Sequence, residues 1–241
     1  MKKSILFSVI LISSIIASAQ VSNINLSMGA TIPLGDYKST ADAASTGYAG
    51  TGFTLNVGGK YFIVDYLGIG GTLNYGTNST DEDALKESWL QYVKDLYPDY
   101  IIPPDANVEF NTNLWNYVNL MVGPVFSIPA SRISFEFKAQ VGISFITPPK
   151  RELYITYTNN EIYNNSGGSN VAFGYLLGAS IVFQANDDYG VRIGADYFGS
   201  KAKLDLESRV DDGIGGSEII TEVWEVPVTA IHATVGIVYF F

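Results

Sequence analysis

The stretch ISFEFKAQVGISF, residues 133–145, decides the fold because its apolar and polar residues alternate without a break. Its odd positions are all apolar, whereas its even positions are polar or glycine. A β-strand points successive side chains to opposite faces, so this stretch predicts a strand with one apolar and one polar face. A strand of a soluble sandwich shows the same alternation with its apolar face turned inward.

The same alternation recurs along the chain and predicts eight strands in total. The other seven segments lie at residues 24–32, 53–61, 67–76, 114–126, 171–183, 191–197 and 229–241. With its flanks, each segment can supply the roughly 9 to 11 residues that a tilted membrane strand needs. Single-chain bacterial barrels have an even number of strands, which agrees with this count.

The links between these segments alternate in length, and this favours a membrane barrel over a sandwich. Short links at residues 63–66, 127–132 and 185–189 alternate with long ones at 36–48, 78–113, 148–170 and 199–226. Outer-membrane barrels have short periplasmic turns and long extracellular loops. We therefore expect an all-β fold: an eight-stranded antiparallel transmembrane β-barrel of up-and-down meander topology with long extracellular loops, and with both termini periplasmic. Further alternation at 202–206 and 220–226 predicts that the last two strands continue as a hairpin beyond the membrane, with a similar extension at 153–157. If these segments belong to the membrane wall instead, the barrel has ten strands, which is the alternative.

The first residues have the order of a secretory signal peptide. Lys2 and Lys3 precede an apolar run at 5–16, and the small residues at 17–19 follow it. That run is too short to cross a bilayer of about 30 Å as a helix. We expect a signal peptide at 1–19 and a barrel domain at 20–241, with an uncleaved anchor as the alternative. Because the chain has no cysteine, it cannot be a lipid-anchored lipoprotein or use disulfides or thiol chemistry.

Composition supports the same interpretation and excludes one class of partner. Charged residues make up 16% of the chain, below the roughly 25% of ordinary soluble domains. Aromatic residues reach 13%, and there are 24 glycines. The net charge of -10 argues against nucleic acid, since contacts to phosphates need lysine and arginine.

Several phrases resemble a known family. They are ASAQ at 17–20, GATIPLGDY at 29–37, VGPVFS at 122–127 and YFF at 239–241. The chain resembles the outer membrane protein beta-barrel domain family of Bacteroidota, an OmpA-like group of eight-stranded transmembrane barrels. This resemblance implies residence in the lipid bilayer of the bacterial outer membrane.

The last strand carries a further resemblance. Apolar residues occupy every second position up to the end of the chain, where the residue is aromatic, as in the carboxy-terminal signal read by the barrel assembly machinery. That machinery is therefore an expected partner during biogenesis. The assembly signal consists of Ala233, Val235, Ile237, Tyr239 and Phe241.

The interior of an eight-stranded barrel is just wide enough for side chains to fill it. Strand parity turns five charged residues inward, where a charge is stable only if it is paired. We therefore predict a lumenal ion-pair network that fills and rigidifies the barrel, with a gate for small solutes as the alternative. The network consists of Lys60, Glu136, Lys138, Arg192 and Asp196.

The long segment at 78–113 predicts an amphipathic helix of about four turns outside the membrane. Thr80, with Asp83 three residues later, is the expected cap, and Pro98 the expected end. Its apolar face is expected either to pack as a lid over the barrel mouth or to dock an extracellular protein or ligand. This face consists of Leu85, Trp89, Tyr92, Val93 and Leu96.

Residues for catalysis or metal binding are sparse. The only histidine, His232, lies in the last strand and is expected to face the lumen, away from any rim site of the Ser, His and Asp kind. The acidic runs at 81–83 and 211–212 lack the spacing of a calcium loop. We expect no catalytic residue, no cofactor and no metal site.

These observations favour an outer-membrane barrel with a structural or surface-interaction role. The first alternative is a narrow porin or a transport barrel for small molecules or lipophiles. The second is a hydrolase or acyltransferase with its site at the rim.

Overall fold

The computed structural model describes residues 20–42, 45–96, 106–157, 160–167, 170–211 and 217–241. The expected signal peptide at 1–19 therefore lies outside the described residues.

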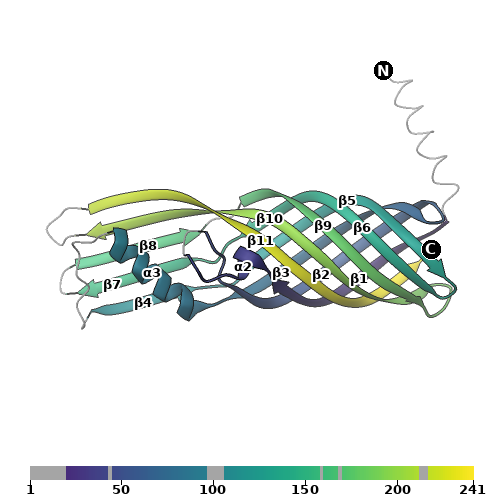
Figure 1. Ribbon diagram of the computed structural model, residues 1–241, viewed down its shortest axis with the longest axis horizontal. Coiled ribbons are helices and arrows are strands. Elements are labelled where there is room, and N and C mark those ends of the chain that lie inside the picture. Colours follow the sequence, from purple (N-terminus) through teal and green to yellow (C-terminus); the bar gives the residue numbers. More distant parts are fainter. Residues whose placement is uncertain (1–19, 43–44, 97–105, 158–159, 168–169, 212–216) are drawn as a thin grey trace, which may run out of the picture.

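Eight antiparallel strands form a closed ring (Figure 1). Each strand of the ring pairs with the ring strand that follows it in the sequence, and β11 closes the ring by pairing with β1. This confirms the predicted eight-stranded barrel, and the ten-stranded alternative is wrong. The ring consists of β1 (Gln20–Pro33), β2 (Ala49–Val64), β3 (Leu67–Thr80), β5 (Trp115–Ala130), β6 (Ile133–Thr147), β9 (Asn170–Gln184), β10 (Tyr189–Asp211) and β11 (Ser217–Phe240).

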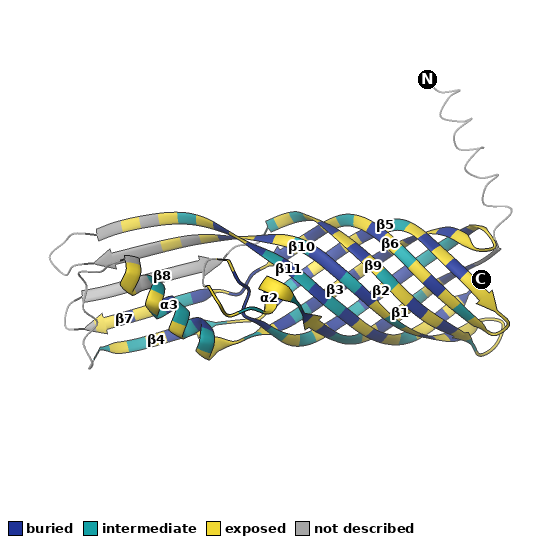
Figure 2. Cartoon of the chain, viewed as in Figure 1, coloured by how far each residue is buried: buried dark blue, intermediate teal, exposed yellow. Residues whose placement is uncertain are grey.

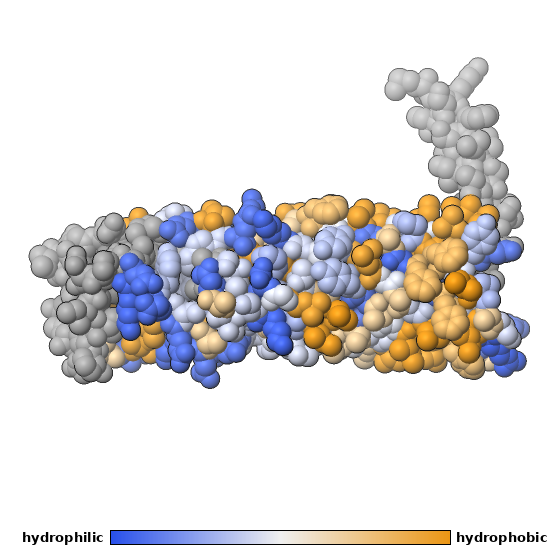
Figure 3. Space-filling view, in the orientation of Figure 1, coloured by the Kyte–Doolittle hydropathy of each residue, from blue (hydrophilic) through white to orange (hydrophobic). Residues whose placement is uncertain are grey.

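Buried and exposed residues alternate along the strands of the ring (Figure 2), as expected when successive side chains point to opposite faces of the wall. Leu120 is 59% exposed and Ile193 is 63% exposed, whereas their neighbours Asn119 and Arg192 are 0% and 4% exposed. On the face shown in Figure 3, apolar side chains gather over the barrel strands, whereas polar side chains gather toward the end of the molecule that carries the loops. Apolar side chains on the outer face of the wall, with polar groups inside, match a lipid environment, where a closed ring satisfies every backbone hydrogen bond.

Beyond the ring, β10 and β11 continue as a long hairpin that carries three more strands. The far half of β10 pairs with β8 (Asn160–Gly167), β8 pairs with β7 (Arg151–Tyr157), and β7 pairs with β4 (Asn107–Thr112). We call this five-stranded sheet the extension. It confirms the predicted continuation of the last hairpin and the strand at 153–157, whereas β4 and β8 were not predicted.

Two helices lie at the same end as the extension, which we call the loop end. They are α2 (Gly35–Lys38) and the predicted amphipathic helix, α3 (Glu82–Leu96). The expected cap of α3 was wrong by one residue: Asp81 Oδ1 accepts from the Ala84 backbone N–H at 3.2 Å, whereas the Thr80 hydroxyl donates to the Asn113 carbonyl at 2.7 Å. Neither helix of the described part of the chain is long and apolar enough to cross a membrane.

Candidate functional site

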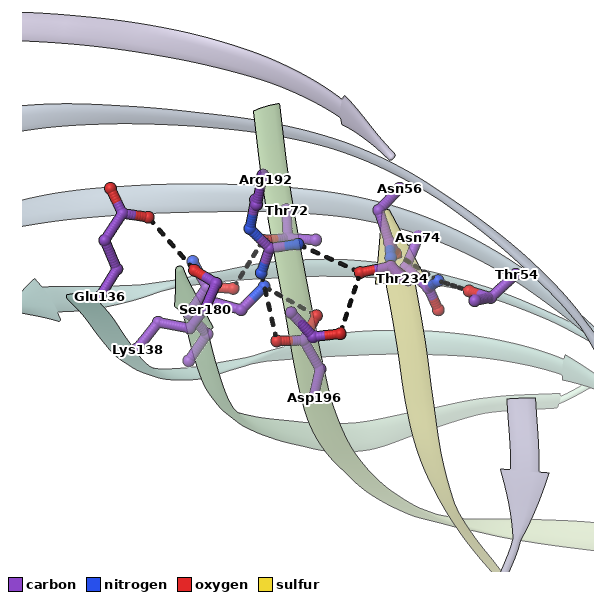
Figure 4. A network of polar contacts seen from close by, with 12 residues as sticks. Thr54, Asn56, Thr72, Asn74, Glu136, Lys138, Ser180, Arg192, Asp196 and Thr234 are labelled. Atoms are coloured by element: carbon purple, nitrogen blue, oxygen red, sulfur yellow. Dashed lines mark hydrogen bonds and ion pairs between the residues drawn. The ribbon is translucent and has the colours of Figure 1, made fainter. Parts of the chain in front are cut away.

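The five predicted charged residues all lie inside the barrel and form two separate groups. Figure 4 shows the group around Asp196, with Lys138 and Arg192, and Glu136 of the other group beside it. Lys60 of β2 pairs with Glu136 of β6, with side chains 6% and 8% exposed. Lys138 Nζ lies 3.1 Å from Asp196 Oδ2, and Arg192 lies 3.6 Å from the other oxygen of the same carboxylate. The side chain of Asp196 is 1% exposed, so one buried carboxylate pairs with two cations.

A glycine makes room for this second group. Gly178 of β9 is the register partner of Lys138 on β6 and of Asp196 on β10, so it lies between them. A Cβ atom at this position would lie 2.1 Å from Asp196 Oδ1 and 2.6 Å from Lys138 Cε. The missing side chain therefore lets the ion pair bridge across β9.

Next to the charges, a directed chain of amides runs along the inner face of the wall, across the neighbouring strands β2, β3 and β5. Asn119 Nδ2 donates to Asn74 Oδ1 at 2.8 Å, and Asn74 Nδ2 donates to Asn56 Oδ1 at 2.5 Å. Asn74 Nδ2 also lies 2.6 Å from the Thr54 hydroxyl oxygen. These bonds fix the orientation of all three amides, since reversing one would place two acceptors or two donors together.

Toward the loop end, the lumen is filled by stacked rings. Tyr117 lies nearly parallel to Phe198, with ring centroids 5.3 Å apart, and to His232, with centroids 5.9 Å apart. The Tyr117 hydroxyl lies 3.0 Å from His232 Nε2 and 3.0 Å from the Thr31 hydroxyl. His232 is 0% exposed, so the structure places this imidazole in the packed interior rather than at the rim.

At the loop end, the first long loop packs into the mouth of the barrel, and α3 contacts this loop through the Tyr48 hydroxyl, which donates to the Ser88 hydroxyl at 2.6 Å. Tyr37 of α2 is buried and meets the edge of Trp115, with ring centroids 5.1 Å apart. Trp115 Nε1 donates to the Gly47 carbonyl at 2.9 Å, and the Tyr37 hydroxyl donates to Asn78 Oδ1 at 3.3 Å. Burial raises the pKa of the Tyr37 hydroxyl well above its ordinary value, so it remains a donor. We call residues 34–42 and 45–48 the plug.

At the opposite end, where the described chain begins and ends, the lumen widens into a vestibule of about 400 Å³. Phe62, Val182 and Phe240 form its apolar wall, whereas Asn23 and Asp65 add polar groups. Glu136 also lines this cavity, so the vestibule reaches inward as far as the Lys60–Glu136 ion pair.

The predicted apolar face of α3 packs against the extension. Leu85 and Trp89 are fully buried, and Trp89 meets Trp224 of β11 with ring centroids 5.4 Å apart. Tyr92 contacts the same indole at 5.1 Å, and its hydroxyl donates to Glu222 Oε2 at 3.2 Å. The side chains of Val93 and Leu96 lie outside the described part of the structure.

A buried arginine that sequence reasoning missed joins the plug to the extension. Arg151 of β7 is 0% exposed, and its guanidinium lies 5.9 Å from the Tyr48 ring centroid and 5.7 Å from that of Trp89. It donates to the Thr46 carbonyl at 3.3 Å. Burial lowers the pKa of Arg151 to about 10, which still leaves it charged at neutral pH. A single arginine after a loop has no periodic pattern that could have identified it.

The predicted assembly signal lies on the outer face of the closing strand. Ile237 is 62% exposed and Phe241 is 69% exposed. Ile237 is the register partner of Leu26 on β1, another exposed apolar residue, so the seam of the ring is apolar on its outer face. Within the described residues, no three His, Asp or Glu side chains gather in a way that could hold a metal ion.

The sequence profile described as "Outer membrane protein beta-barrel domain" matches residues 7–226. The chain therefore belongs to this family and is an outer-membrane β-barrel. The assignment to the Bacteroidota group of this family stays a prediction. No curated protein matches the chain.

Solved structures of similar shape include three outer-membrane or surface proteins. A major outer membrane protein from Thermus thermophilus is 14% identical, with 91% of this chain and 99% of that chain covered and a TM-score of 0.49. The outer membrane protease OmpT from Escherichia coli is 9% identical, with coverage of 93% and 98% and a TM-score of 0.44. Neisserial surface protein A is 10% identical, with coverage of 93% and 99% and a TM-score of 0.42. Likeness at this level says nothing about activity.

Proposed function

We propose that this barrel neither conducts solutes nor catalyses a reaction, and that it serves as a structural wall element whose extension makes contacts at the cell surface. The observation that carries this proposal is the filled lumen. Ion pairs, amides, stacked rings and the plug follow one another from the vestibule to the loop end. A continuous water path would require several of these buried polar contacts to break together, and each broken contact is costly in a low-dielectric interior.

The lengths of the connections support an orientation with the extension outside. The three tight turns of the ring, at 65–66, 131–132 and 185–188, lie at the end where the described chain begins and ends. Short turns face the periplasm in outer-membrane barrels. Both termini are then periplasmic. In this proposal residues 1–19 act as a cleaved signal peptide, and the outward residues of the last strand are read by the assembly machinery. The mass of the mature protein tests the first point, because cleavage predicts a chain that begins at Gln20.

The extension offers a surface for a neutral or cationic partner. Ile219 and Val223 of β11 are each 58% exposed on the face of the sheet opposite the buried Trp224. Acidic residues outnumber lysines by eight to two at residues 78–112, a range that includes α3 and β4. Such a surface repels polyanions unless divalent cations bridge them. A protein or ligand with little negative charge therefore fits this surface best.

Conductance in planar bilayers tests the proposal. Purified protein whose folded state is verified by its heat-dependent shift in gel mobility is expected to give no steady current. A steady, ion-selective current from the folded protein would overturn the proposed sealed lumen. Turnover of lipid or peptide that disappears in His232→Gln, with the gel shift unchanged, would overturn the non-enzymatic part.

The vestibule favours one alternative, a transport barrel for small molecules. Its volume of about 400 Å³ lies within the range of pockets that hold small ligands. Release of an entrapped solute from proteoliposomes, at a rate that rises with protein content, would favour transport over the sealed barrel. Proteoliposomes made with heat-unfolded protein provide the control for leakage.

A further inference from the structure

The charges buried in the lumen do not balance. Lys60, Lys138 and Arg192 supply three cations, whereas Glu136 and Asp196 supply two carboxylates. The ion pair Lys60–Glu136 is balanced, so the surplus belongs to the group in which Asp196 serves both Lys138 and Arg192. The side chains of that group are 15% exposed or less. An unbalanced charge at such depth is costly unless a counter-charge accompanies it.

A small polar cavity lies against the surplus charge. Its volume is about 30 Å³, which is room for about two water molecules. Its lining includes all three cations but only one of the two carboxylates, Glu136, and Asp196 is not part of it. The cavity is therefore more positive than the lumen as a whole.

An unsatisfied amide donor lines the same cavity. Asn56 is 3% exposed, and its Nδ2 group has no hydrogen-bond partner among the described residues. The chain from Asn119 through Asn74 fixes Asn56 Oδ1 as an acceptor, so its donor end is the one left over beside the cavity. Aligned amides polarise one another, which increases the positive character of the last N–H group.

We propose that this cavity binds one halide ion, chloride under ordinary conditions, between Lys138, Arg192 and the Asn56 amide. A single negative charge neutralises the surplus cation and accepts the orphan amide hydrogen bond. The small volume selects a monatomic anion over a tetrahedral oxyanion. The site lies on the closed side of the Lys60–Glu136 ion pair, and it does not require that the lumen conducts.

Thermal unfolding in three salts of equal ionic strength tests the halide site in solution. Folded protein in detergent is compared in sodium chloride, sodium bromide and sodium gluconate, because gluconate is too large for the cavity. The unfolding midpoint is expected to be several degrees higher in the two halides, since a ligand that binds only the folded state stabilises it. Crystals grown in bromide are expected to show one anomalous scattering peak beside Lys138 and Arg192.

Two variants and one matched control locate the effect. Lys138→Met removes the surplus charge, and Asn56→Asp supplies the negative charge covalently, so both are expected to lose the halide dependence and the bromide peak. If Lys138→Met does not fold, Asn56→Asp alone decides the test. Lys201→Met removes a lysine whose side chain is 59% exposed and should keep the halide dependence of the wild type. Equal midpoints in all three salts and a cavity without bromide would overturn the proposal, as would a halide effect that survives in Asn56→Asp.

Discussion

Exchanging Glu136 for glutamine tests whether the lumenal charges rigidify the barrel. The change preserves side-chain volume but leaves the Lys60 ammonium, 6% exposed, without its carboxylate. Removing one partner of a buried ion pair costs about 3–5 kcal/mol, because the other charge stays buried and uncompensated. The exposed pair Lys201–Glu225, with side chains 59% and 45% exposed, provides the control: its loss in Glu225→Gln is expected to lower the free energy of unfolding far less, because water screens both charges.

The assay must report the barrel rather than the loop end. All three tryptophans, Trp89, Trp115 and Trp224, lie in the apolar cluster at the loop end, so their fluorescence follows the plug and the extension. Urea titration in lipid vesicles, scored by the heat-dependent gel shift, follows the barrel itself.

A double variant separates the ion pair from general damage. Lys60→Met combined with Glu136→Gln removes both charges and is expected to recover most of the lost stability, because no unpaired charge remains. If Glu136→Gln unfolds within about 0.5 kcal/mol of the wild type, the spread expected of ordinary surface substitutions, then the pair does not stabilise the barrel and the reasoning fails.

Three further changes test other parts of the structure. Gly178→Ala would push a Cβ into Asp196 and is expected to lower the free energy of unfolding by about 1–3 kcal/mol, whereas Gly71→Ala, whose Cβ would meet nothing closer than 3.7 Å, should be nearly neutral in the same urea titration. Trp89→Ala is expected to destabilise the packing of α3 by about 3–5 kcal/mol, seen as faster trypsin cleavage of the loop end with an unchanged barrel gel shift. Deleting Phe241 should reduce the amount of folded barrel in outer-membrane fractions without changing total synthesis, and unchanged amounts would contradict its proposed role in assembly.

Strand parity explains why so much of the barrel can be predicted from the sequence. A position two residues away always returns to the same face, so the stretch at 133–145 correctly placed Phe137 outward, at 49% exposed, and Gln140 inward, at 2%. Strand parity also predicts that the five lumenal charges point inward. It could not say which charges meet, because that depends on the register between strands that are not adjacent in sequence and on the empty position at Gly178.

Loop-end structure was harder to predict because its contacts are not periodic. β8 has the sequence NEIYNNSG and β4 has NVEFNT, which are too short or too polar to show a clear alternation. The plug is held by side chains that bond to backbone carbonyls, as Trp115 does to Gly47 and Arg151 to Thr46. Such bonds depend on where a carbonyl happens to lie in the folded loop, and residue type alone does not encode this.

The long hairpin of β10 and β11 has a mechanical consequence. β10 pairs with β9 only as far as Gly199 but continues to Asp211, which adds roughly 40 Å of strand beyond the ring at about 3.4 Å per residue. Because the same two strands belong to the wall and to the extension, a pull on the far end of the hairpin loads the ladders that join β10 to β9 and β11 to β1 lengthwise, in shear. The hairpin would then transmit tension from its far end directly to the barrel wall in the membrane, without first separating the other strands of the extension from β10.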